Sequence, residues 1–223
     1  MVSEMVTYIG LDSFDLILYQ ACVLAKMQKK VLIIEDSKRM ERCPFTSMLP
    51  VPKGVDERKE IITFRRIDFA LFLPEEECLH AYDTVFISAG YSGSPYDLDT
   101  NREVYVTDLF TCNMEAVKRI MCKSACPRRS LVIRNNVFSS VCLDLLDEEM
   151  EGMVDGVGTE VIHLNENDHF NALLCQNGES FKFKLLSAEL KKYLVKELGR
   201  LCPEADKRWI HTAYRAASRG GVT

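Results

Sequence analysis

Residues 8–15 occupy the place in this sequence where a nucleotide-binding protein would hold a phosphate group. A strand-like run precedes them and a helix-like run follows, which is how nucleotide-binding α/β proteins begin. In such a loop, backbone N–H groups and a lysine surround the phosphate oxygens. Here the loop contains one glycine, Gly10, two carboxylates, Asp12 and Asp15, and no lysine. Because carboxylates repel a polyphosphate, the layout favours nucleotide binding while the side chains oppose it.

The elements that must position this loop alternate between strands and helices. Apolar runs predict strands at 5–9, 31–34, 61–64, 82–90, 103–108, 130–135 and 161–164, and helical spacing predicts helices at 16–27, 114–121 and 188–201. The short run at 69–72 fits a strand or the start of a helix, and the polar stretch 165–169 is expected to be a loop. Near-continuous apolar strands separated by helices indicate a mainly parallel sheet covered on both faces. We therefore predict a single α/β domain with three layers.

The composition limits the class of protein. The chain has 223 residues, of which 47% are hydrophobic and 27% are charged, and a formal net charge of −5. These values fit one globular domain and exclude a disordered or fibrous protein, and the negative charge argues against nucleic-acid binding. No apolar run reaches the roughly 18–20 residues that cross a bilayer, and the first residues lack the pattern of a secretion signal. We therefore expect a cytoplasmic protein.

Nine cysteines are scattered along the chain, which is typical of reduced thiols in a cytoplasmic protein. Cys122 and Cys126 are four positions apart, so they would share a helix face and could supply half of a metal site. No matching pair of cysteines or histidines lies near them in the sequence. We therefore expect no metal site.

The end of the chain has a second distinctive pattern. Helical spacing over 207–219 gathers apolar residues on one side and basic residues on the other, and Trp209 is the only tryptophan. We divide the chain into a domain at 1–206 and a basic amphipathic tail at 207–223. One interpretation is a tail that lies on a membrane surface, where Trp suits the headgroup boundary, and the other is a helix docked on its own domain or on a second subunit. The contact residues that we assign to the tail are Arg208, Trp209, Ile210 and Arg215.

Four segments, taken in this order, carry a resemblance to a known family. They are the helix and strand at 24–34, the strand at 82–90, the strand at 104–108 with the helix at 114–121, and the strand end at 132–136. Together they resemble the ParA/MinD family of deviant P-loop ATPases, which position plasmids, division sites, flagella and pili in bacteria. The resemblance covers nearly the whole chain. It implies a three-layer, P-loop NTPase-like domain.

The departures from the family pattern fall on the reacting groups. The alignment that the resemblance implies puts Ser13 in place of the P-loop lysine, Asp15 near the magnesium-binding hydroxyl and Ser88 in place of a strand-end aspartate. Tyr8 stands roughly where the family has a lysine that reaches across the dimer. Phosphoryl transfer depends on positioned positive charge, each such group contributing about 3–4 kcal/mol. We therefore expect no catalytic residue and no ATP hydrolysis.

These observations lead us to expect a catalytically inactive ParA/MinD-like protein without a cofactor. Its expected role is that of an adaptor or scaffold in bacterial positioning, envelope assembly or secretion-machine assembly. Its expected partners are proteins, with a homodimer and peripheral membrane contact as further options, and nucleic acid is not expected.

Two alternatives stay open. In the first, the protein still binds ATP or ADP and is a switch that dimerises with ATP, with weak or no hydrolysis. The residues that would bind the nucleotide are Gly10, Ser13, Asn135 and Asn136. The simpler interpretation of the two asparagines is that they cap a turn. In the second, the chain is a Rossmann-like dinucleotide enzyme, because Glu35 and Asp36 follow the second strand, although the first turn lacks the glycines that admit a pyrophosphate.

Overall fold

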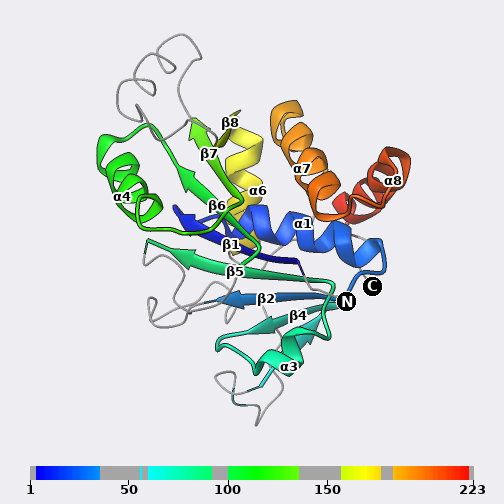
Figure 1. Cartoon of the computed structure of the whole chain (residues 1–223). Coiled ribbons are helices and arrows are strands. Elements are labelled where there is room, and N and C mark those ends of the chain that lie inside the picture. The colour runs from blue at the N-terminus through cyan, green and yellow to red at the C-terminus, as the bar shows by residue number, and fades with distance from the viewer. Residues whose placement is uncertain are drawn as a thin grey trace.

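The computed structural model describes residues 4–35, 56, 60–91, 100–135, 157–176 and 183–220. Within them, eight strands form one sheet in the order β3-β4-β2-β5-β1-β6-β7-β8 (Figure 1). Their bounds are Glu4–Gly10 (β1), Val31–Glu35 (β2), Ile62–Phe64 (β3), Ile67–Ala70 (β4), Thr84–Gly90 (β5), Arg102–Thr107 (β6), Arg129–Asn135 (β7) and Gly158–His163 (β8). Every neighbouring pair is parallel except β3 and β4. The mainly parallel sheet of the sequence analysis is confirmed.

The β3–β4 pair is a tight antiparallel hairpin at one edge. Its two turn residues, Arg65 and Arg66, both have left-handed backbone angles, with φ of 51° and 63°. Two such residues form the turn whose twist matches that of an antiparallel pair. Of the run at 69–72, for which the sequence allows a strand or a helix, residues 69 and 70 lie in strand β4, and residues 71 and 72 follow its end.

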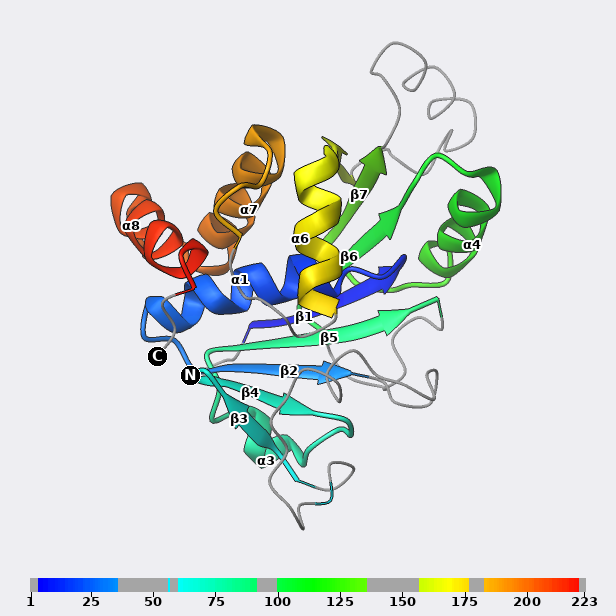
Figure 2. The ribbon, with the colours of Figure 1, turned by 180° about the vertical axis from the view of Figure 1, so that it is seen from behind.

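Helices cover both faces of the sheet (Figures 1 and 2). Their bounds are Phe14–Lys26 (α1), Glu76–Leu79 (α3), Thr111–Met121 (α4), Glu166–Gln176 (α6), Ala188–Leu201 (α7) and Lys207–Ser218 (α8). Helices α1, α6, α7 and α8 share one hydrophobic core with one face of the sheet, and α3 and α4 share a second core with the other face. Successive residues of β1 show the division, because Tyr8 packs in the first core and Ile9 in the second. This is the three-layer α/β domain that the sequence predicts.

Helix α6 begins at Glu166, so the loop that the sequence predicts at 165–169 is wrong. Asn165 and Asp168 cap the helix start reciprocally, because each backbone N–H donates to the other's side chain at 3.0 Å. The Asp168 carboxylate is fully buried and also accepts the backbone N–H of Ser187 at 2.7 Å. The helix is therefore held to the segment before α7 by a polar contact.

Helix α8 packs against α1 of its own domain (Figure 2). Phe183 lies between the two helices, with its ring centroid 4.7 Å from that of Tyr19 and 5.6 Å from that of Tyr214. Ile210 is 2% exposed, whereas Trp209 is 43% exposed. Of the contact residues assigned to the tail, Ile210 thus lies in the core, and Arg208, Trp209 and Arg215 lie at the surface.

Truncating Ile210 and Trp209 is expected to lower the stability by unequal amounts. Ile210→Ala removes a fully packed side chain and should lower the free energy of unfolding by about 2–3 kcal/mol. Trp209→Ala should lower it by less than about 1 kcal/mol, because the ring leaves much of its surface in water. Urea unfolding of both variants measures the difference. Equal losses would mean that α8 does not pack as described.

No helix among the described residues is long and apolar enough to cross a bilayer.

Candidate functional site

The candidate site lies at the carboxyl end of β1, the central strand between β5 and β6. Open parallel sheets bind ligands in the crevice outside the carboxyl ends of their strands. Here β1 ends at Gly10 and α1 begins at Phe14, so three residues connect them. A phosphate-binding loop of the G-x-x-x-x-G-K-[ST] type uses about eight residues to encircle its ligand. The connection is therefore too short to wrap a phosphate.

The backbone of this connection already donates to the protein itself. The N–H of Leu11 donates to the Val106 carbonyl oxygen at 2.9 Å, and the N–H of Phe14 donates to the Asp12 carboxylate at 3.0 Å. Gly10 has φ of 109°, and an added Cβ would lie 2.1 Å from the Val106 carbonyl oxygen. The turn is thus pressed against β6, with two N–H groups directed away from any bound anion.

An arginine from β7, Arg134, contacts both the turn and the start of α1. The Arg134 guanidinium donates two hydrogen bonds to the Asp15 carboxylate, at 2.8 and 2.9 Å, and a third to the Asp12 carbonyl oxygen at 3.0 Å. The Arg134 side chain is 12% exposed and that of Asp15 is 4% exposed. Such a two-point pair fixes both side chains more firmly than a single contact would.

The electrostatics of the turn therefore differ from the expectation of two free carboxylates. Burial alone would lower the pKa of Arg134, but Asp15, with smaller contributions from Asp12 and Tyr19, outweighs burial and raises the pKa above its usual value. The guanidinium stays charged and neutralises Asp15. Asp15 is therefore not an unpaired carboxylate at the turn, as the sequence suggests, but one partner of an internal ion pair.

The residues named for a surviving nucleotide site are packed rather than open. Gly10, Ser13 and Asn135 are all buried, the last two with 3% and 1% of their surface exposed. The Asn135 carbonyl oxygen accepts the N–H of Leu164 at 2.9 Å. Asn136 and Asp36 lie outside the described residues.

Tyr8 and Asp108 are also engaged within the domain. The hydroxyl of Tyr8 accepts a hydrogen bond from the Gln20 amide at 2.6 Å, and burial raises its pKa. Its side chain is 1% exposed, so it does not extend toward a second subunit. Asp108, just beyond β6, accepts two hydrogen bonds from the Asn113 amide, at 2.9 and 3.0 Å. Ser88 is half-buried and lies beside Tyr8 in the sheet.

The described residues contain no group of three or more His, Cys, Asp or Glu side chains that could hold a metal ion. Cys122 is exposed and Cys126 is half-buried.

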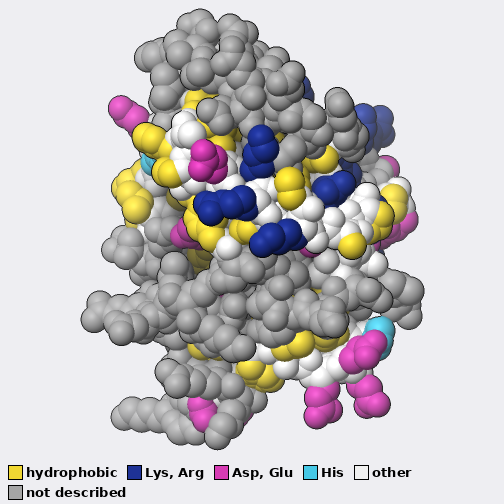
Figure 3. All heavy atoms as spheres, turned by 60° about the vertical axis from the view of Figure 1, so that its left-hand side comes forward, with side chains coloured by type: hydrophobic (Ala, Val, Ile, Leu, Met, Phe, Trp, Pro, Cys, Tyr) yellow, Lys and Arg dark blue, Asp and Glu magenta, His cyan; other side chains and the backbone are white. Residues whose placement is uncertain are grey.

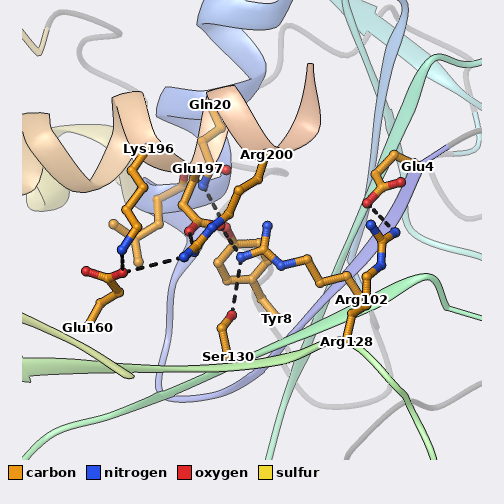
Figure 4. A network of polar contacts seen from close by, with 11 residues as sticks. Glu4, Tyr8, Gln20, Arg102, Arg128, Ser130, Glu160, Lys196, Glu197 and Arg200 are labelled. Carbon is orange, nitrogen blue, oxygen red and sulfur yellow. Dashed lines mark hydrogen bonds and ion pairs between the residues drawn. The ribbon is translucent and has the colours of Figure 1, made fainter. Parts of the chain in front are cut away.

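A buried polar network lies at the opposite end of the sheet, where β6 and β7 begin (Figure 4). The Arg102 guanidinium contacts the Glu197 carboxylate of α7 and donates to the Ser130 hydroxyl at 3.3 Å. Glu197 also accepts from Arg200, which lies 3.6 Å from Glu160 at the surface. The side chains of Arg102 and Glu197 are 8% and 2% exposed. This network ties α7 to the sheet, away from the candidate site.

Removing only the charge of Glu197 is expected to loosen this attachment. Glu197→Gln keeps the shape but leaves Arg102 buried without a carboxylate, so we expect a loss of about 1–3 kcal/mol in the free energy of unfolding. Glu160→Gln, at a partly exposed ion pair, should cost less than about 1 kcal/mol. Chemical denaturation of the two variants side by side gives the comparison. A Glu197→Gln variant as stable as Glu160→Gln would contradict the network.

The chain has the fold of the ParA and MinD ATPases. A MinD cell division protein of Aquifex aeolicus aligns with a TM-score of 0.59 at 13% identity, over 92% of this chain and 98% of its own. A ParA family ATPase of Chlorobium tepidum TLS aligns with 0.55 at 10% identity, over 97% and 98%. A chain of the MinC:MinD cell division protein complex of Aquifex aeolicus aligns with a TM-score of 0.55 at 12% identity, over 92% of this chain and 97% of its own. No protein-family model and no curated protein matches the sequence.

Proposed function

We propose that this chain, which has the ParA/MinD-like fold, has no ATPase activity and acts as an adaptor or scaffold for other proteins. The observation that carries the proposal is the buried pair of Arg134 and Asp15, seated against a connection of three residues. A structurally similar protein, MinD, forms a complex with MinC, which supports a protein as the partner here. The setting that we propose is bacterial positioning, envelope or secretion-machine assembly.

The energetic argument concerns the cation that a phosphate would need. Phosphoryl transfer requires positive charge directed at the β- and γ-phosphates, supplied by a lysine and a magnesium ion. The cation at this turn is Arg134, whose guanidinium is already bound to Asp15. Diverting it to a phosphate would strand a buried carboxylate, at a cost of about 3–5 kcal/mol. That cost corresponds to a loss of roughly two to four powers of ten in affinity.

The surface that recruits a partner need not involve the candidate site. Arg208, Trp209 and Arg215 of α8 are exposed and combine cations with an aromatic ring. Such a surface suits either an anionic protein or an anionic membrane. We propose it as a contact region, with protein as the partner.

A steady-state assay of ATP hydrolysis with magnesium tests the proposal. The purified protein should release phosphate no faster than the same protein after heat denaturation. Asp12→Ala serves as the diagnostic variant, because Asp12 is exposed and lies in the connection after β1. Hydrolysis by the natural chain that Asp12→Ala abolishes would contradict the proposal.

A further inference from the structure

A groove with an apolar floor and basic rims runs between α7 and α8. Its volume is about 930 Å³, and Val195, Gly199, Ile210 and Tyr214 contribute to its floor. Gly199 leaves space on the α7 side of the floor, because a Cβ added to it would still lie 4.0 Å from the Ile210 side chain. The two helices lie side by side on the face that α1 also covers (Figure 2).

Among the described residues, every charged side chain that lines the groove is basic, in a chain whose net charge is −5. Lysines come from α7 and the segment before it, a lysine and an arginine come from α8, and a second arginine follows the end of α8. They are Lys184, Lys191, Lys192, Lys196, Lys207, Arg215 and Arg219, with His211 beside them. Lys196 is paired with Glu160. Within the described part of the chain, no carboxylate forms an ion pair with Lys191, Lys192, Lys207 or Arg215.

We propose that this groove binds an acidic amphipathic helix of a partner protein. The lining of α7 runs from Ala188 to Gly199, which is about 17 Å at the rise of an α-helix. Cations flank the floor on both sides along this length. A helix with an apolar stripe and carboxylates on either side of it presents matching groups along the same length. A lipid with one anionic headgroup would meet the cations at one end only.

Two contributions would act together in this complex. The apolar stripe would bury against the floor, and the carboxylates would pair with lysine and arginine side chains at the rim. The rim pairs are exposed, so they would contribute more to the rate of association and to salt sensitivity than to tight binding. The inference rests on the proposed adaptor role for its purpose. The binding itself involves no nucleotide.

The test uses a fluorescent synthetic peptide about 18 residues long, a length that supports an isolated helix. It carries leucines at helical spacing with glutamates on both flanks. We expect saturable one-to-one binding by fluorescence anisotropy, weakened at least tenfold when lysines replace the glutamates. Raising sodium chloride from about 50 to 500 mM should also weaken it severalfold. A scrambled peptide of the same composition should bind at least tenfold more weakly.

Paired variants locate the binding site. Lys192→Glu with Arg215→Glu should weaken binding about tenfold. Lys123→Glu is the control, because Lys123 is exposed just beyond α4, on the other face of the sheet. Figure 3 shows that Lys and Arg side chains also gather on the face that carries α4. Unchanged peptide affinity in Lys123→Glu would therefore exclude binding on that face. In a second pair, Gly199→Phe should fill the groove and abolish binding, whereas Gly199→Ala should preserve it.

Several outcomes would overturn the proposal. The first is equal affinity for the acidic and the lysine peptides. The second is a loss of peptide affinity in Lys123→Glu as large as the loss in the Lys192→Glu, Arg215→Glu variant. The third is unchanged peptide binding in Gly199→Phe. Circular dichroism of each variant confirms that it is folded, and a Gly199→Phe variant that unfolds leaves the charge pair to decide. Vesicles of phosphatidylglycerol and phosphatidylcholine form the last arm. Binding to vesicles without binding to the peptide would overturn the proposal and indicate a membrane ligand. ATP hydrolysis by the protein would contradict the proposed adaptor role but not the binding of a helix in the groove.

Discussion

Replacing Arg134 by methionine is expected to lower the free energy of unfolding by about 3–5 kcal/mol. The variant leaves the carboxylate of Asp15, which is 4% exposed, without its partner in the protein interior. Arg134→Lys should recover only part of the loss, because an ammonium group cannot reproduce the two-point contact. Urea unfolding of the three proteins gives the values.

A control and a double variant make this result specific. Arg128→Met removes an exposed arginine that pairs with Glu4 at 2.7 Å, and it should cost less than about 1 kcal/mol. Arg134→Met combined with Asp15→Leu removes both charges, so it should be more stable than the sum of the single losses predicts. Strictly additive losses would show that the two side chains do not interact.

Gly10→Ala is the second change with a large expected effect. The backbone angle of Gly10 lies in the left-handed region, which alone costs a side chain about 1–3 kcal/mol. The new Cβ would also lie 2.1 Å from the Val106 carbonyl oxygen, so strand β1 or β6 must shift. We expect a loss of at least about 3 kcal/mol, or a protein that does not accumulate in the soluble fraction.

Gly158→Ala is the matched control for this change. Gly158 opens strand β8, has no positive φ, and has no atom within 4 Å of an added Cβ. Its substitution should change the stability by less than about 1 kcal/mol. If Gly10→Ala were as well tolerated as Gly158→Ala, the turn after β1 would not be packed against β6.

The strands at the centre of the sheet could be predicted from the sequence for a physical reason. Parallel strands covered on both faces need apolar side chains at successive positions, and β2 shows this with four buried residues in a row. Helix α1 could also be predicted from the sequence, because it is apolar over most of its length, and twelve of its residues are buried.

Helix α6 could not be predicted in the same way, because its pattern is inverted. Asp168 and Asn171 are buried, whereas Phe170 and Leu173 are 59% and 55% exposed. Periodicity looks for apolar residues inside, so it finds no helix here. The Asn165 and Asp168 pair, three positions apart, was the signal that could have located the helix start.

The ion pair at the candidate site could not be predicted from local sequence patterns. Arg134 and Asp15 are 119 positions apart, and only the order of the strands brings β7 near the start of α1. The sequence indicated that the family's cation was missing from the loop. It could not indicate that a cation from elsewhere in the chain stands there instead. The docking of α8 on its own domain is one of the interpretations that the sequence allows, but the sequence cannot select it, because an amphipathic helix shows that a face must be covered but not by what.

The Arg134–Asp15 ion pair at the turn after β1 should prevent a nucleotide from binding there. Titration calorimetry of the natural chain with ATP and magnesium measures this binding. We expect no saturable heat up to about 1 mM ATP, a limit that corresponds to a binding free energy weaker than about −4 kcal/mol. Saturable one-to-one binding in the micromolar range, dependent on magnesium and abolished by Asp12→Ala, would contradict it.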